Sequence, residues 1–163
     1  MIVWRIAQTT PLYRAEDISG ASAAATGGRW NPMGLPMVYC SATLSLAYLE
    51  TLAHLNLGAP LPRNRYRIQV DIPDDIWQKR RIARLTPDWP ADWDAEPAGK
   101  GNIDYGGKWL TAVTEAVLVV PSVAIPREEN ILLNPRHPDF GQIKASNLGR
   151  VEFDPRLFAV RTQ

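Results

Sequence analysis

Three side chains suited to binding or catalysis occur close together between Gly27 and Glu50. Arg29 follows two glycines, and an arginine in such a turn can bind an anionic group through its planar set of donors. Tyr39 lies in an apolar stretch, and Glu50 is the only charged residue of the apolar segment that follows. A carboxylate in such surroundings needs an explanation. The spacing therefore predicts a phosphate-binding turn beside a functional carboxylate.

Each of these residues also has an ordinary structural explanation. Arg29 could be a surface side chain in an ion pair worth under about 1 kcal/mol. Trp30 could fill the core instead of offering a stacking surface, and Tyr39 could simply have its hydroxyl bonded by a neighbour. Glu50 could be half exposed and serve solubility, and Ser122 could cap the turn after its strand. The residues alone leave these alternatives open.

The apolar pattern predicts the elements that position these side chains. Ser41 or Thr43 suits the N-cap of a helix over 44–57. Arg5, in the first strand, either points into a cleft or lies at a sheet edge. The stretch 116–122 is the most apolar and predicts a central strand. The predicted strands cover residues 2–6, 37–40, 65–72, 116–122 and 151–154, with short strands around Pro126 and a possible extension over 157–160.

Three segments have less regular patterns. The small-residue run at 20–25 favours a loop over a helix because it adjoins two glycines. Residues 86–107 hold three prolines, four glycines and an acidic cluster, which predicts an irregular excursion that serves as a lid or a partner surface. Trp89 and Trp93 would anchor it, and a short helix over 108–113 would follow.

Strands thus outnumber helices and occur in clusters, which predicts an α+β fold with a largely antiparallel sheet and flanking helices. The length of 163 residues and an apolar fraction of 45% are typical of one domain over 1–163. A net charge of +1 gives no broad basic surface for direct nucleic-acid binding.

The absence of several patterns narrows the function further. Cys40 is the single cysteine, which excludes an internal disulfide, and its apolar context favours a buried small hydrophobe. Two histidines without a neighbouring thiol or carboxylate cluster predict no metal site. No leader and no long apolar span are present, so we expect no membrane association and a cytoplasmic location.

Taken together, the motifs resemble those of the RES domain family, which takes its name from an arginine, a glutamate and a serine. Here these match Arg29, Glu50 and Ser122, and the resemblance covers nearly the whole chain except the excursion. The motifs that carry it are Trp4-Arg5, GGRWNP at 27–32, Val38-Tyr39, Leu49-Glu50, Val120-Pro121-Ser122, Asn134-Pro135 and His137-Pro138-Asp139-Phe140.

The resemblance implies a toxin of a type II toxin–antitoxin system, paired with an Xre-type helix-turn-helix antitoxin. It also implies a split-sheet fold similar to that of the ADP-ribosyltransferases, which bind NAD+ without Rossmann glycines. NAD+ would be the substrate, and the leading prediction is its consumption by hydrolysis or by phosphorolysis with inorganic phosphate, which depletes NAD+ and arrests growth. Transfer of ADP-ribose to a protein acceptor is the alternative within the same enzyme class. A binding module without catalysis remains the alternative from another class.

The family's site would fall on matching positions of this sequence. Glu50 would stabilise the positive charge that develops on the ribose, or hold a ribose hydroxyl. Tyr39 would orient the nicotinamide, and Arg29, with Arg5, would bind the pyrophosphate. We thus expect Glu50, Arg29 and Tyr39 to be catalytic, and Arg5, Ser122 and Trp30 to join Arg29 and Tyr39 in binding NAD+.

Overall fold

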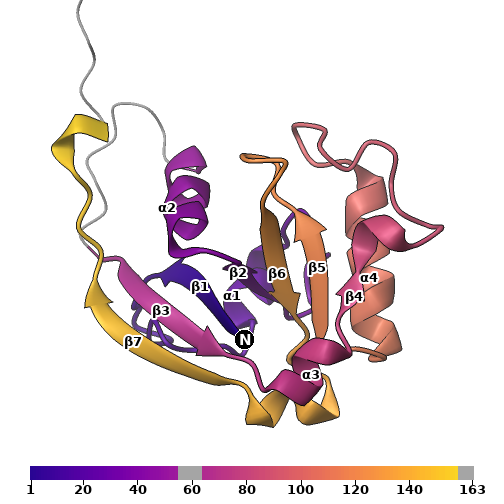
Figure 1. Cartoon of the computed structure of the whole chain (residues 1–163), viewed down its shortest axis with the longest axis horizontal. Helices are drawn as coiled ribbons and strands as arrows, with labels where there is room; N and C mark the ends of the chain where they lie inside the picture. Colours follow the sequence, from indigo (N-terminus) through magenta and orange to yellow (C-terminus); the bar gives the residue numbers. More distant parts are fainter. Residues whose placement is uncertain (55–63, 158–163) are drawn as a thin grey trace, which may run out of the picture.

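Seven strands form one sheet across the residues described by this computed structural model, which are 1–54 and 64–157 (Figure 1). The strands are β1 (Ile2–Ala7), β2 (Val38–Ser41), β3 (Tyr66–Asp71), β4 (Arg81–Ile82), β5 (Val117–Pro121), β6 (Glu129–Leu133) and β7 (Lys144–Arg150). Their order across the sheet is β4-β5-β6-β2-β1-β3-β7. All neighbours are antiparallel except β4 and β5, so the prediction of a largely antiparallel α+β fold is confirmed.

The sheet divides between β1 and β2. These two strands pair only at Trp4 and Ser41. By contrast, β1 pairs with β3 along six residues, and β2 pairs with β6 along four. The strands therefore fall into two halves, β4-β5-β6-β2 and β1-β3-β7, which confirms the split sheet implied by the family resemblance.

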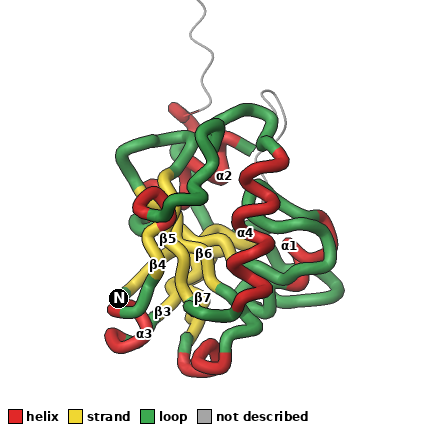
Figure 2. Tube along the Cα trace, turned by 90° about the vertical axis from the view of Figure 1, so that its right-hand side faces the viewer, coloured by secondary structure: helices red, strands yellow, loops and turns green. Residues whose placement is uncertain are grey.

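Four α-helices and three short 3₁₀ helices flank the sheet in the described residues. They are α1 (Ala21–Thr26), α2 (Leu44–Ala53), α3 (Asp74–Gln78) and α4 (Lys100–Ala112), with 3₁₀ helices at Ala83–Leu85, Pro138–Gln142 and Pro155–Leu157. In Figure 2, α4 runs along one side of the sheet and α2 lies towards its upper end. None of the helices within residues 1–54 and 64–157 has the length and hydrophobicity of a membrane span.

Two apolar cores form because successive side chains of β5 point to opposite faces. Val117 and Val119 belong to the core that includes Val3, Ile68 and Val70 on the far half of the sheet. Leu118 and Val120 belong to a second core with Trp109 and Leu110 of α4. All five residues of β5 are buried, which explains why this is the most apolar stretch of the sequence.

Two helical predictions need correction. The run predicted as a loop at 20–25 is largely the helix α1, since alanine is the best helix former, and Asn31 Nδ2 ties this helix down by donating to Ala23 O. Helix α4 begins at Lys100 rather than 108, so the irregular excursion covers only about 86–99. Its glycines obscured the helix in the sequence, yet Gly106 allows α4 to pack directly against Trp30.

Predictions for the last third of the chain were also partly wrong. Residues 125–128 form a turn, so a single strand, β6, follows Pro126 instead of a pair. The last strand is β7 and not the predicted stretch 151–154. Strand β7 forms by pairing with β3, and its residues have no apolar periodicity that would reveal it in the sequence. The predicted helix residues 55–57 and strand residues 158–160 lie outside the described part of the chain.

Candidate functional site

A cleft of about 700 Å³ lies where the two halves of the sheet part. Its walls include residues of β1, β2, α1, α2 and the segment that joins α1 to β2. The cleft is lined by five of the six predicted site residues, Arg5, Arg29, Trp30, Tyr39 and Glu50. Its volume falls within the range of about 300–1,000 Å³ that is typical of ligand pockets.

Helix α2 carries Glu50 to the wall of this cleft. Thr43 caps the helix, since its hydroxyl accepts a 3.1 Å hydrogen bond from Leu46 N, which confirms one of the two predicted N-caps. Leu46 and Ala47 are buried, so Glu50, one turn further, lies at the border of the buried face and is half buried. This placement agrees with the prediction for Glu50.

Two side chains from β5 and β6 hold the Glu50 carboxylate. Ser122 Oγ donates to Glu50 Oε1 at 2.7 Å, and Asn130 Nδ2 donates to the same oxygen at 2.5 Å. Among the described residues, both hydrogen bonds to Glu50 reach Oε1 and none reaches Oε2. The carboxylate is therefore fixed through one oxygen, which leaves the other available at the cleft.

Ser122 itself is completely buried, immediately after the last residue of β5. Its hydroxyl donates to Glu50 and accepts a 2.9 Å bond from Ile125 N, so it also caps the turn that leads to β6. The alternative of a turn cap is thus confirmed, together with a direct link to the predicted carboxylate. Ser122 does not line the cleft itself, and its hydrogen bond to Glu50 connects it to a residue that does.

The GGRWNP turn is built around the hydroxyl of Tyr39. Tyr39 Oη donates to Asn31 Oδ1 at 2.7 Å and accepts from Trp30 N at 3.1 Å. A Cβ at Gly28 would lie 2.6 Å from Tyr39 Oη, so glycine is required there. Burial raises the pKa of Tyr39, which keeps the phenol neutral. The hydroxyl is satisfied by neighbours, as the structural alternative predicted, and the phenol ring forms part of the cleft wall.

Arg29 binds the excursion rather than lying free in the cleft. Its Nη1 donates to Trp93 O at 3.2 Å and to Ala95 O at 2.8 Å, and its Nη2 pairs with Glu96 Oε2 at 2.7 Å. The Arg29 side chain is 18% exposed, whereas Glu96 is 78% exposed. The ion-pair alternative for Arg29 is thus confirmed, with Glu96 as the partner, and Glu96 also lines the cleft. Phosphate binding by Arg29 stays a prediction.

Aromatic packing anchors the excursion, as predicted from its tryptophans. Trp89 stacks on Trp30 with ring centres 5.2 Å apart, and Trp93 packs against Trp89 at 5.9 Å. Trp30 is 3% exposed and also meets the edge of Tyr105. This arrangement favours the core-filling alternative for Trp30 over a ring that stacks on a ligand.

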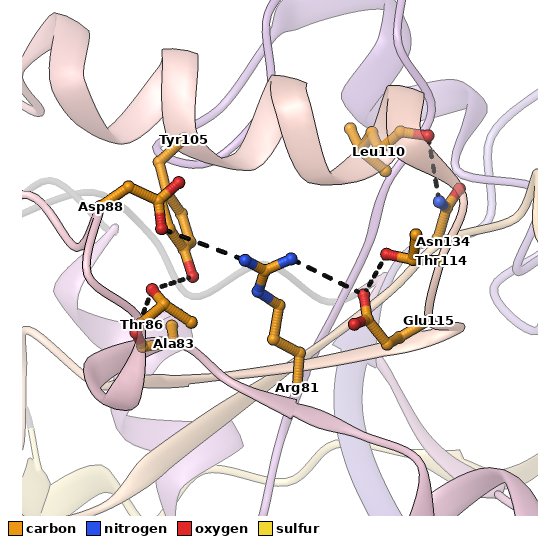
Figure 3. A network of polar contacts seen from close by, with 9 residues as sticks. All are labelled: Arg81, Ala83, Thr86, Asp88, Tyr105, Leu110, Thr114, Glu115 and Asn134. Atoms are coloured by element: carbon orange, nitrogen blue, oxygen red, sulfur yellow. Dashed lines mark hydrogen bonds and ion pairs between the residues drawn. The ribbon is translucent and has the colours of Figure 1, made fainter.

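Arg81 connects the start of the excursion, at Asp88, to Glu115, which precedes β5. In Figure 3 its guanidinium lies between Asp88 and Glu115. Arg81 Nη2 is 4.0 Å from Asp88 Oδ1, and Arg81 Nη1 is 3.9 Å from Glu115 Oε2. Beside it, Tyr105 of α4 shares a 3.0 Å hydrogen bond with Thr86. The excursion is therefore fixed by polar contacts at one end and by Arg29 near the other.

Arg5 points into the cleft, which decides between its two predicted positions. Its Nη1 donates to Asp17 O at 3.3 Å, and its buried Nε has no hydrogen-bond partner among the described residues. The neighbouring Cys40 is buried, as predicted, and burial raises the pKa of its thiol to about 12, against the opposing effect of the Arg5 charge. Arg5 therefore supplies positive charge to a cleft that Asp17, Glu50 and Glu96 also line.

Sequence reasoning missed Asn130 and Ser41. Ser41 Oγ donates to Asn130 Oδ1 at 2.8 Å, and Asn130 in turn donates to Glu50. The two residues are cross-strand partners of β2 and β6. In the sequence, Ser41 is only a polar residue at the end of an apolar stretch, and Asn130 one at the start of another. The strand register that places them side by side is not visible in the sequence.

The described residues contain no group of three or more His, Cys, Asp or Glu side chains that could hold a metal ion. The site instead consists of one fixed carboxylate, two arginines and a tyrosine around a cleft. Such a set can bind an anionic ligand and stabilise a positive charge that develops beside the carboxylate.

Comparison with known proteins identifies the family. The family model described as "RES domain" matches residues 2–154. The chain is 46% identical over 155 residues to the Prs ADP-ribosylating toxin of Sphingobium sp. (strain YBL2), with 94% of each chain covered. It is 38% identical over 160 residues to the Toxin Res of Yersinia enterocolitica serotype O:8 / biotype 1B, with 96% of this chain and 99% of the relative covered.

A solved structure has the same fold. The crystal structure of the M. tuberculosis MbcT–MbcA toxin–antitoxin complex contains a chain that aligns with 96% of this one and is itself covered to 86%, with a TM-score of 0.57 and 18% sequence identity. The similarity at this identity concerns the fold alone. With a family model and relatives that match along nearly its whole length, this chain belongs to the RES domain family.

Proposed function

We propose that this protein is a toxin that cleaves the nicotinamide–ribose bond of NAD+ and transfers the ADP-ribose to a protein acceptor. The preference for a protein acceptor rests on the relative that is 46% identical and bears the name Prs ADP-ribosylating toxin. Hydrolysis and phosphorolysis share the same first bond cleavage and differ only in the acceptor. The three reactions therefore share one cleavage site, and they differ in whether a protein group, water or phosphate is the nucleophile.

An antitoxin partner belongs to the same proposal. The similar solved chain comes from a toxin–antitoxin complex, and further relatives are named Toxin Res. An antitoxin that blocks the cleft would explain how a cell tolerates an enzyme that consumes NAD+. We propose a helix-turn-helix antitoxin of the Xre type, as the family resemblance implies.

The chemistry begins with departure of nicotinamide from the ribose. The C–N bond breaks, its electron pair leaves with nicotinamide, and the anomeric carbon becomes electron-poor. A nucleophile of the acceptor then bonds to this carbon and loses a proton. Glu50 stabilises the developing positive charge through its ionised carboxylate, with Oε2 directed to the reacting ribose because Oε1 is already occupied.

The remaining groups of the cleft bind and orient NAD+. Arg5 attracts the pyrophosphate through its positive charge, since Arg5 lines the cleft and forms no ion pair with a carboxylate of the described residues. The Tyr39 ring provides an aromatic surface for the nicotinamide. Arg29 contributes to phosphate binding once a phosphate oxygen replaces the Glu96 carboxylate.

One observation carries the proposal: Glu50 is held by Ser122 and Asn130, with its second oxygen unblocked at the wall of a dinucleotide-sized cleft. A glutamate that served only solubility would not be held by two donors from two strands. The arrangement is that of a preorganised charge.

The direct test is incubation of the purified protein, free of antitoxin, with NAD+ labelled in the adenosine part, both alone and with a cell lysate that supplies protein acceptors. Release of nicotinamide supports the cleavage, and label on a lysate protein supports a protein acceptor. Free ADP-ribose indicates hydrolysis instead, and ADP-ribose 1″-phosphate in phosphate buffer indicates phosphorolysis. Tight binding of NAD+ with no release of nicotinamide contradicts the proposal and favours a binding module.

A further inference from the structure

Asn130 lies at the start of β6, lines the cleft, and makes the shorter of the two hydrogen bonds to Glu50. We propose that Asn130 is a positioning residue for the reaction, which holds Glu50 in the one orientation that leaves Oε2 free for the ribose. This inference rests on the proposed function, because it assigns Glu50 its catalytic charge. It adds a residue outside the arginine, glutamate and serine that name the family.

Ser41 supports the orientation in which the Asn130 NH₂ group faces Glu50. Ser41 Oγ donates to Asn130 Oδ1 at 2.8 Å, so the carbonyl end of the amide is occupied and the NH₂ end is directed to Glu50. Ser41 and Asn130 are cross-strand partners, and Ser41 is also the single pairing position between β2 and β1. The Asn130 amide is therefore held by a residue that lies where the sheet divides.

The two donors restrict the carboxylate from different strands. Ser122 approaches from the end of β5 and Asn130 from the beginning of β6, and both reach the same oxygen. A glutamate side chain with one donor can still rotate about its terminal bonds, whereas two donors at Oε1 fix the direction of Oε2. Asn130 thus provides orientation that Ser122 alone does not.

The chemistry at this position requires an amide rather than a carboxylate. An aspartate at 130 has nearly the same shape, but it would place a carboxylate oxygen 2.5 Å from Glu50 Oε1. Two carboxylates at this distance cannot both be ionised, so the pair retains a proton to higher pH. The charge on which catalysis depends would then appear only at higher pH.

The test compares Asn130→Ala, Asn130→Asp and Ser41→Ala with the wild-type protein in nicotinamide release from NAD+. Asn130→Ala should lower kcat by about 10- to 100-fold and change KM by less than about 3-fold, since the lost bond orients a charged group rather than the substrate. Asn130→Asp should shift the acid limb of the pH–rate profile to higher pH by about one unit or more. Ser41→Ala should give a smaller loss of kcat.

A matched control exists on β7. Asn147 also donates to a glutamate, Glu16, at 3.3 Å, but neither residue lines the cleft. Asn147→Ala and Asn147→Asp should leave kcat, KM and the pH profile unchanged. The other charged side chains and the histidine that line the cleft are the same in every variant, so a shift seen only in Asn130→Asp belongs to the altered pair. They are Arg5, Arg14, Asp17, Arg29, His54, Arg65 and Glu96.

A crystal structure of Asn130→Ala provides a readout that does not need activity. We expect the Glu50 side chain to leave the observed orientation or to occupy more than one. The inference is wrong if Glu50 stays in place in that structure, or if Asn130→Asp has the wild-type pH profile. If the wild-type protein releases no nicotinamide, the proposed function fails, and the position of Glu50 in the variant still decides whether Asn130 orients it.

Discussion

Ser122 and Glu50 are 72 positions apart in the chain, yet Ser122 Oγ donates a hydrogen bond of 2.7 Å to Glu50 Oε1. The serine is completely buried and the glutamate faces the cleft. This pair joins the end of β5 to helix α2 and connects the interior of the protein to the proposed reaction centre.

Replacement of Ser122 by alanine should lower the turnover of NAD+. A hydrogen bond to a charged group is worth about 1.5–3 kcal/mol, so we expect kcat to fall by about 10- to 100-fold. Nicotinamide release by Ser122→Ala measures the effect, with the melting temperature recorded in parallel because Ser122 also accepts a bond from Ile125 N. Ser45→Ala, on the exposed side of α2, is the control and should behave as wild type. Undiminished kcat in Ser122→Ala would show that Glu50 does not depend on this bond.

Removal of the Glu96 carboxylate should strengthen NAD+ binding. Glu96 pairs with Arg29 Nη2 at the edge of the cleft, so Glu96→Gln replaces an ion pair with a weaker neutral hydrogen bond that a phosphate oxygen displaces more easily. Because Glu96 is 78% exposed and solvent screens the pair, we expect KM for NAD+ to fall by only about 2- to 5-fold. Asp94→Asn removes the same charge from the same exposed loop and should leave KM unchanged. A raised KM in Glu96→Gln would mean that Arg29 serves the loop and not the substrate.

Gly106 should be intolerant of any side chain. A Cβ there would lie 1.9 Å from Trp30 O, a backbone atom that cannot move without displacing the GGRWNP turn. Gly106→Ala should therefore lower the free energy of unfolding by more than about 2 kcal/mol, even though alanine favours the helix. At Gly107 the nearest atom to a new Cβ is the side-chain atom Pro32 Cδ at 3.3 Å, a tight contact that a small shift relieves, so Gly107→Ala should lower stability much less than Gly106→Ala. Urea unfolding measures both, and equal stability of Gly106→Ala and wild type would contradict the packing described.

Cys40 should resist alkylation in the folded protein. Burial raises the pKa of its thiol from 9.0 to about 12, so the thiolate is scarce at about pH 8. Because the folded pKa exceeds the unfolded one, the thiol's contribution to stability is complete below pH 9.0 and is lost as the pH rises towards 12. Iodoacetamide labelling followed by mass spectrometry should find Cys40 unmodified without denaturant and modified in urea. Rapid labelling of the folded protein would contradict its burial.

Much of the site was predictable because its parts have clear local signals. A glycine pair before Arg29, an isolated carboxylate at Glu50 and a serine at the end of an apolar strand each form a pattern within a few residues. The structure brings Glu50 and Ser122 into contact and lines one cleft with Arg5 and Tyr39. The split antiparallel sheet was likewise predicted, from clustered strands and from the family motifs.

The features that were missed depend on contacts between distant segments. Asn130 reaches Glu50 only because β2 and β6 pair in one register, and Arg29 binds an excursion more than sixty residues away. Strand β7 has no apolar period because it lies at the edge of the sheet and is mostly exposed. In α4, low intrinsic helix propensity is outweighed by packing against Trp30, which a local pattern does not report.

The most direct test of the account is nicotinamide release from NAD+ by Glu50→Gln. The glutamine keeps the shape of the side chain and an oxygen that can accept from Ser122 and Asn130, so the variant removes the charge and little else. We predict a loss of at least about 10²- to 10³-fold in kcat with an unchanged melting temperature. Glu152→Gln, an exposed glutamate outside the cleft, should retain full activity. Activity of Glu50→Gln within about 3-fold of wild type would contradict the central claim that the Glu50 carboxylate drives the cleavage.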